Sequence, residues 1–142
     1  MKRKQRRLGR ELALLWLFQI DMGKLPMDEV IAEIPDELTG VEEEALTFAL
    51  QLIHGYHADT ERIDRAIVRY AKGWPLKRMA AIDRNVLRIA LCEIYNMPDI
   101  PASVSVDEAV EVAKHYSTEE SGKFVNGILG AFLRGEEGVA DQ

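Results

Sequence analysis

Apolar residues return every three or four positions along nearly the whole chain, which is the period of an amphipathic helix. The pattern predicts helices over about residues 8–20, 27–34, 39–57 and 59–71, one between Pro75 and Pro98 that can break near Ala81, and two over 105–116 and 117–134. No stretch alternates with period two for long enough to predict a strand. We therefore expect an all-α protein of about seven helices, packed as two small helical bundles.

Capping residues mark several of these boundaries. Thr39 with Glu42, and Ser117 with Glu120, have the Ser/Thr-x-x-Glu spacing of a capping box, in which both side chains satisfy free amides at a helix start. Asp59 is placed to cap the helix over 59–71. These signals predict helices that begin close to residues 39, 59 and 117.

The segment 82–97 is apolar around most of its circumference, which predicts a helix buried at the centre of the fold. Cys92 within it is expected to be a small core residue. The predicted organisation is a basic arm over 1–10, one helical domain over 8–134 with subdomains over about 8–57 and 59–134, and a flexible tail over 135–142.

The composition is that of one folded domain, and it excludes several classes of protein. The chain has 142 residues, of which 47% are hydrophobic and 30% are charged, with a single cysteine. One cysteine excludes an internal disulfide framework and a cysteine-rich zinc site. No apolar run approaches the ~18 residues that a membrane span needs. We expect a cytoplasmic protein that makes no membrane contact.

Charge is placed unevenly along the chain. Residues 1–10 hold six basic groups and no acidic group, whereas the other 132 residues hold 12 basic and 24 acidic groups. A basic segment on an acidic body is the pattern expected of a protein that binds a phosphate backbone. A solubilising, disordered terminus is the alternative interpretation, and charge alone does not separate the two.

Enzyme signatures are absent from the sequence. It contains no GxxxxGK[ST], GxGxxG or GxSxG motif, and Cys92 has no neighbouring base. His54 and His57 share a helix face, but two histidines near a helix end more often interact with the helix dipole than with a metal. We expect no catalytic residue, no metal site and no cofactor.

The first helix carries a second face beside its core stripe. Arg7, Glu11, Leu14 and Phe18 fall together on this face, with arginine at one end and an apolar patch at the other. Such a face could dock nucleic acid and a protein partner side by side. The alternative is that another helix of the same chain buries Leu14 and Phe18, and the residues alone favour it.

The last helix places Phe124 at the edge of its apolar stripe, with Glu120 and Gly127 on the same outer side. An aromatic ring beside a glycine could stack on an unpaired RNA base. Phe124 could equally be a peripheral core residue, and both interpretations remain open at this point.

Four blocks of sequence resemble the NusB family of transcription antitermination factors. They are RRLGRELA from Arg6, DRNVLRIALCE from Asp83, DEAVEVAK from Asp107 and KFVNGIL from Lys123, in the family's order. The resemblance implies a seven-helix fold of two bundles, binding to the single-stranded boxA element of ribosomal RNA leaders, and a heterodimer with the ribosomal protein NusE. It also implies loading onto RNA polymerase in an antitermination complex, without enzymatic activity.

Position by position, the resemblance and the basic segment together assign the candidate sites. The expected RNA-binding residues are Lys2, Arg3, Lys4, Arg6, Arg7, Arg10, Glu120 and Phe124, and the expected partner-binding residues are Phe18, Leu14 and Asp83. Phe18 stands where the family has a tyrosine, so a hydrogen bond from that hydroxyl would be lost. Asp107 replaces the usual asparagine and cannot donate.

Two other interpretations remain. The first is a helical protein-interaction module whose RNA contact is only nonspecific. The second is a homodimer that hides the RNA surface until the partner protein arrives.

Overall fold

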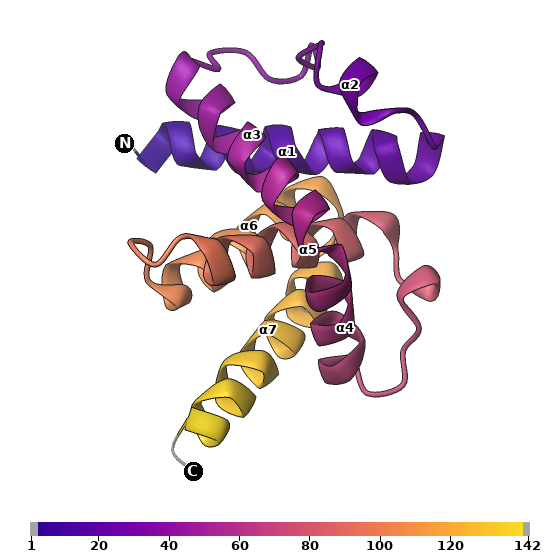
Figure 1. Cartoon of the computed structure of the whole chain (residues 1–142), viewed down its shortest axis with the longest axis vertical. Helices are drawn as coiled ribbons and strands as arrows, with labels where there is room; N and C mark the ends of the chain where they lie inside the picture. Colours follow the sequence, from indigo (N-terminus) through magenta and orange to yellow (C-terminus); the bar gives the residue numbers. More distant parts are fainter. Residues whose placement is uncertain (1–2, 141–142) are drawn as a thin grey trace.

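The computed structural model describes residues 3–140, and over that range it contains helices and no strand (Figure 1). The α-helices are α1 (Arg3–Gly23), α2 (Met27–Val30), α3 (Glu43–Ala58), α4 (Thr60–Tyr70), α5 (Ala81–Asn96), α6 (Ala102–Tyr116) and α7 (Glu119–Ala140), with a 3-10 helix, η1 (Leu76–Arg78), before α5. The expected all-α architecture of seven helices is confirmed. No helix in this range is long and apolar enough to cross a membrane.

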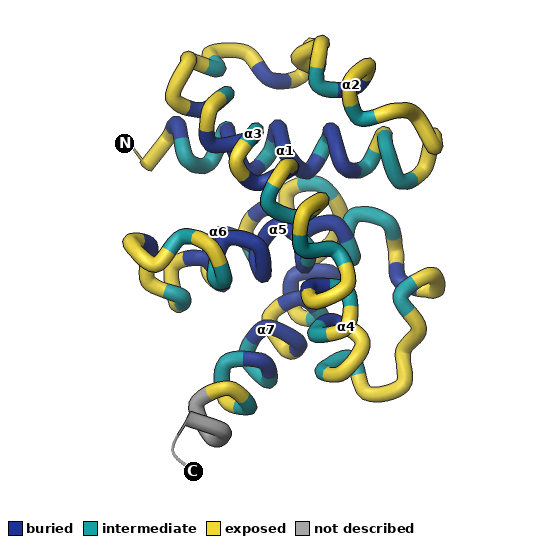
Figure 2. The backbone as a smooth tube through the Cα atoms, in the orientation of Figure 1, coloured by how far each residue is buried: buried dark blue, intermediate teal, exposed yellow. Residues whose placement is uncertain are grey.

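Helix α5 lies at the centre and joins the two helical bundles. It packs against α1 and α3 on one side and against α4, α6 and α7 on the other (Figure 1). Leu87, Leu91 and Cys92 are almost completely buried, and α5 is dark along most of its length in Figure 2. The predictions of a central helix and of a core role for Cys92 are confirmed.

The first helix begins five residues earlier than the apolar pattern predicts, because a tertiary contact stabilises its first turns. Gln5 is buried, its side-chain amide donates to the carbonyl of Gly40 at 3.3 Å, and its carbonyl accepts the amide of Glu42 at 3.0 Å. This contact takes the place of the expected Thr39–Glu42 capping box, which is wrong: α3 begins at Glu43 without a side-chain cap. Residues 3–10 of the basic segment are therefore the start of a helix rather than an arm.

The predicted caps of α7 and α4 and the predicted end of α2 also differ from those in the structure. Thr118, not Ser117, caps α7, because its hydroxyl accepts the amide of Ser121 at 3.0 Å. Asp59 is the N-cap residue of α4, but its side chain makes no capping bond. Helix α2 ends at Val30, and the indole of Trp16 donates to the carbonyl of Glu33 just beyond it at 2.8 Å.

Helix α7 continues to Ala140, past the expected end near residue 134. Tyr70 of α4 packs against this extension so closely that a Cβ added at Gly135 would lie 2.8 Å from the tyrosine Cζ. Of the expected tail, residues 141–142 lie outside the described residues. The break expected near Ala81 is confirmed, since η1 and a short extended link precede α5.

Candidate nucleic-acid interface

The basic residues of α1 range from exposed to buried. Arg3 and Lys4 are exposed, and Arg6 and Arg7 are half-buried. Lys2 lies outside the described residues. Arg10 is only 4% exposed, so its side chain is not available to RNA, and the expectation that it contacts RNA is corrected.

Arg10 instead forms a buried ion pair with Glu93 of α5. Its Nε and Nη2 donate to the two carboxylate oxygens at 2.7 and 2.9 Å, and Glu93 is 1% exposed. The hydroxyl of Ser105 in α6 also donates to this carboxylate. Because the pair is bidentate and shielded from water, it fixes α1 against α5 and α6.

Glu108 of α6 faces the arginines of α1. Its carboxylate accepts a 2.5 Å hydrogen bond from Arg7 Nε, and it lies 3.5 Å from Arg3 Nε and 4.0 Å from Arg10 Nη1. Burial by itself raises the pKa of the Glu108 carboxyl, but the hydrogen bond from Arg7 and the three arginine charges outweigh burial and lower the pKa. Glu108 is therefore an anion that holds Arg7 against α6.

Two of the open hollows beside the basic turns of α1 contain Arg3. One has a volume of about 400 Å³ and is lined by Arg3, Arg6, Arg10, Val104, Asp107 and Glu108. The other has a volume of about 560 Å³ and is lined by Arg3, Arg7, Asp107, Val110, Glu111 and Asn126. Because Asn126 belongs to α7, the second hollow extends from α1 across α6 to α7, and the carboxylates of Asp107 and Glu111 lie in it beside the two arginines.

Phe124 is paired with Trp74, a residue that the sequence patterns do not single out. The two rings are 6.5 Å apart at 66°, and Trp74 is 51% exposed. Lys72 and Gly73 just before it both have a positive φ, so the chain turns sharply and presents the indole at the surface. A tryptophan in a Lys-Gly-Trp-Pro loop is the signal that could have identified it.

The remaining RNA candidate, Glu120, lies at the start of α7 and its side chain is 83% exposed. Its carboxylate is 3.5 Å from the ammonium of Lys123, one turn along the helix. It is therefore accessible to a ligand near Phe124.

The expected partner face is only partly at the surface. Phe18 is half-buried, but Leu14 is fully buried because α1 packs between α3 and α5, so Leu14 cannot contact a partner. Asp83 is 8% exposed, and burial raises its pKa, an effect that Ser121 partly offsets. Arg84 beside it donates to Asp21 of α1 at 2.6 Å, which joins the Phe18 end of α1 to the start of α5.

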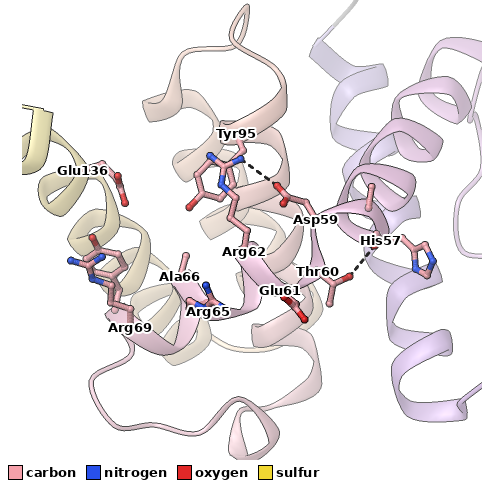
Figure 3. Close-up of a pocket in the computed structure, with 12 residues that line it drawn as sticks. His57, Asp59, Thr60, Glu61, Arg62, Arg65, Ala66, Arg69, Tyr95 and Glu136 are labelled. Carbon is pink, nitrogen blue, oxygen red and sulfur yellow. Dashed lines mark hydrogen bonds and ion pairs between the residues drawn. The ribbon is translucent and has the colours of Figure 1, made fainter.

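A further hollow of about 580 Å³ lies between α4, Tyr95 of α5 and Glu136 of α7 (Figure 3). The guanidinium of Arg62 stands 3.6 Å from the centre of the Tyr95 ring, and Arg65 and Arg69 lie further along α4. The lining also includes three carboxylates, those of Asp59, Glu61 and Glu136. Its three arginines are matched by these three carboxylates, and none of its lining residues belongs to α1.

In the described part of the chain, no three His, Cys, Asp or Glu side chains gather as metal ligands. Burial raises the pKa of the Cys92 thiol to about 11, so it stays protonated at neutral pH.

The family model described as "NusB family" matches residues 7–134. The chain belongs to the NusB family. The transcription antitermination protein NusB of Symbiobacterium thermophilum is 46% identical over 145 residues, covering 95% of this chain and 93% of that protein. The NusB protein of Desulforudis audaxviator is 41% identical over 133 residues, covering 94% and 96%.

Solved structures of NusB proteins have the same fold. T. maritima NusB superposes with a TM-score of 0.82 at 40% identity, covering 94% of this chain and 93% of that one. A structure of antitermination factors NusB and NusE in complex with dsRNA matches with a TM-score of 0.84 at 25% identity, covering 94% and 99%. The resemblance found in the sequence blocks is confirmed.

Proposed function

We propose that this NusB family member is a transcription antitermination factor that binds boxA-type single-stranded RNA together with NusE. The observation that carries the proposal is a surface on which Arg3 and Arg7 of α1 share a hollow with Asn126 of α7, the helix that also carries Phe124 and its contact with Trp74. Relatives named as antitermination proteins, and a similar structure of NusB with NusE and RNA, support it. The RNA-bound pair would then join the RNA polymerase antitermination complex.

In this proposal, different residues contact the phosphates and the bases of the RNA. Arg3, Arg6 and Arg7 present guanidinium groups to the phosphate backbone, which positions RNA without reading its sequence. Trp74 and Phe124 offer aromatic faces on which unpaired bases can stack. Because Arg10 is buried, at most five of the six basic groups in residues 1–10 can meet phosphate. The expected salt dependence on single-stranded RNA is then a slope of about −3.5 rather than −4.

The proposed NusE surface is the end of α1 that carries the half-buried Phe18. Asp83 at the start of α5 is buried, so its carboxylate is not itself part of the exposed surface. The acidic body of the chain suits a basic ribosomal protein and repels RNA away from the basic turns. This function needs no catalytic residue and no cofactor, and its place of action would be the cytoplasm, where transcription proceeds.

The test is binding to boxA RNA and to a scrambled RNA of equal length, with and without NusE, across a salt series. Preference for boxA that NusE strengthens is the expected result. Equal, steeply salt-dependent binding to both RNAs would contradict the proposal and favour a protein-interaction module with nonspecific RNA contact. Light scattering over a concentration series, with and without RNA, tests the homodimer, which a monomer at every concentration would exclude.

Trp74→Ala should weaken boxA binding by about tenfold or more, because a stacked base contributes about 1–3 kcal/mol. Trp74→Phe keeps an aromatic face and should recover most of the affinity. Val68→Ala, at another exposed apolar residue, is the control and should leave binding unchanged. Fluorescence anisotropy with labelled boxA measures all three, and full affinity in Trp74→Ala would remove Trp74 from the site.

Glu108→Gln should strengthen RNA binding by several-fold and leave the salt slope at about −3.5, because Arg3 and Arg7 are already counted in that slope and only lose a carboxylate that competes with phosphate for them. The neutral amide keeps the shape of the side chain while releasing Arg3 and Arg7 from its charge. Glu61→Gln on α4 removes the same charge elsewhere and serves as control. Weaker binding by Glu108→Gln would mean instead that the carboxylate orients Arg7 for RNA.

A further inference from the structure

Gly127 is a glycine in the exposed part of α7 that internal packing does not explain. A Cβ added there would meet no atom within 4 Å. Other helical glycines of the described chain have close neighbours: the same test places a Cβ 2.9 Å from Ala45 O at Gly9 and 2.7 Å from Cys92 Sγ at Gly55. An exposed glycine makes a helix less stable than an alanine at the same position does. Gly127 therefore lowers the stability of α7, and no packing contact inside the protein requires it.

The place of Gly127 on α7 connects the two parts of the proposed RNA surface. The preceding residue, Asn126, lines the hollow that contains Arg3 and Arg7. Phe124 lies one turn before Gly127, on a neighbouring line of the helix surface, and carries the contact with Trp74. On the helical wheel Gly127 falls between Asn126 and Phe124 on the exposed side of α7. A strand of RNA that follows this side from the arginines of α1 to the aromatic pair crosses α7 at Gly127.

We propose that bound RNA crosses the outer face of α7 at Gly127, where the missing Cβ lets the ribose-phosphate backbone lie directly on the helix. This inference rests on the proposed function and adds the path of the RNA to it. The occupant is RNA rather than protein because the two ends of the path carry phosphate-binding and base-stacking side chains. The proposed NusE surface involves the Phe18 end of α1, away from the arginines at its start.

Gly127→Ala distinguishes this role from a structural one, because the two roles predict opposite changes in melting temperature. A glycine that internal packing requires would give a lower melting temperature when replaced, whereas a glycine that only RNA requires would give a higher one. Alanine raises helix propensity, so the variant should melt about 3 °C higher than the wild type. Its Cβ would stand between RNA and helix, so boxA affinity should fall about tenfold, whereas NusE affinity without RNA should not change. Gly130→Ala, one turn further from Phe124, is the matched control. Its Cβ would meet only the flexible Arg134 guanidinium, at 3.2 Å, and boxA affinity should stay at the wild-type value.

Three results would overturn the proposed path. Gly127→Ala could bind boxA as tightly as the wild type, it could melt lower than the wild type, or it could lose affinity for NusE in the absence of RNA. The first denies the close approach, the second reveals internal packing at Gly127, and the third assigns this face to a protein. The wild-type preference for boxA over scrambled RNA is measured alongside, and only its absence would count against the proposed function itself.

Discussion

Replacing Glu93 by alanine should lower the free energy of unfolding by about 3–5 kcal/mol, the largest effect that we expect from a single substitution. The carboxylate is 1% exposed and accepts two hydrogen bonds from Arg10 and one from Ser105. Its removal would leave the Arg10 guanidinium charged, buried and without its bidentate partner. The midpoint of urea unfolding, followed by circular dichroism, measures the loss.

Two further variants make this prediction specific. Glu111→Ala removes an exposed carboxylate, 54% exposed and 3.6 Å from Lys114, and should cost less than about 1 kcal/mol. Arg10→Met combined with Glu93→Met removes both charges and should recover much of the stability lost in Glu93→Ala. If Glu93→Ala cost no more than Glu111→Ala, the buried pair would not be what holds α1 against α5.

Replacing Arg6 and Arg7 together by alanine should weaken boxA binding by about 100-fold, because two charge-assisted contacts to phosphate are lost at about 1.4 kcal/mol each. The salt slope should become less negative by about 1.4, which corresponds to two phosphates on a single strand. Both side chains are half-buried at the surface of α1, so the helix itself should persist. Titrations of labelled boxA at several salt concentrations give affinity and slope together.

The charge-balanced hollow on α4 supplies the matched control. Arg65→Ala with Arg69→Ala changes the net charge of the protein by the same amount, but on the wall of a different hollow (Figure 3). This double variant should leave the boxA affinity nearly unchanged. Equal losses in the two double variants would show that RNA responds to total charge and would contradict the assignment of the α1 arginines.

Local sequence determined the architecture of this protein. Helical periodicity, divided by prolines and capping residues, predicted seven helices and no strand, because amphipathic stripes depend only on the spacing of residues along one segment. The apolar circumference of 82–97 predicted the central helix, and uneven charge singled out the first ten residues. The four family-like blocks pointed to NusB before any contact was known.

Contacts between distant segments decided what each candidate residue can do. Arg6, Arg7 and Arg10 are the same residue type within one turn or two of the same helix. Arg10 nevertheless lies in the core, because Glu93, 83 positions away, neutralises its charge there. Leu14 is buried by the packing of α1 between two helices, and Gln5 rather than a capping box positions the start of α3. Trp74 and Phe124 meet only in the fold. Local patterns state which groups are present, whereas burial and pairing depend on the partners that tertiary packing brings.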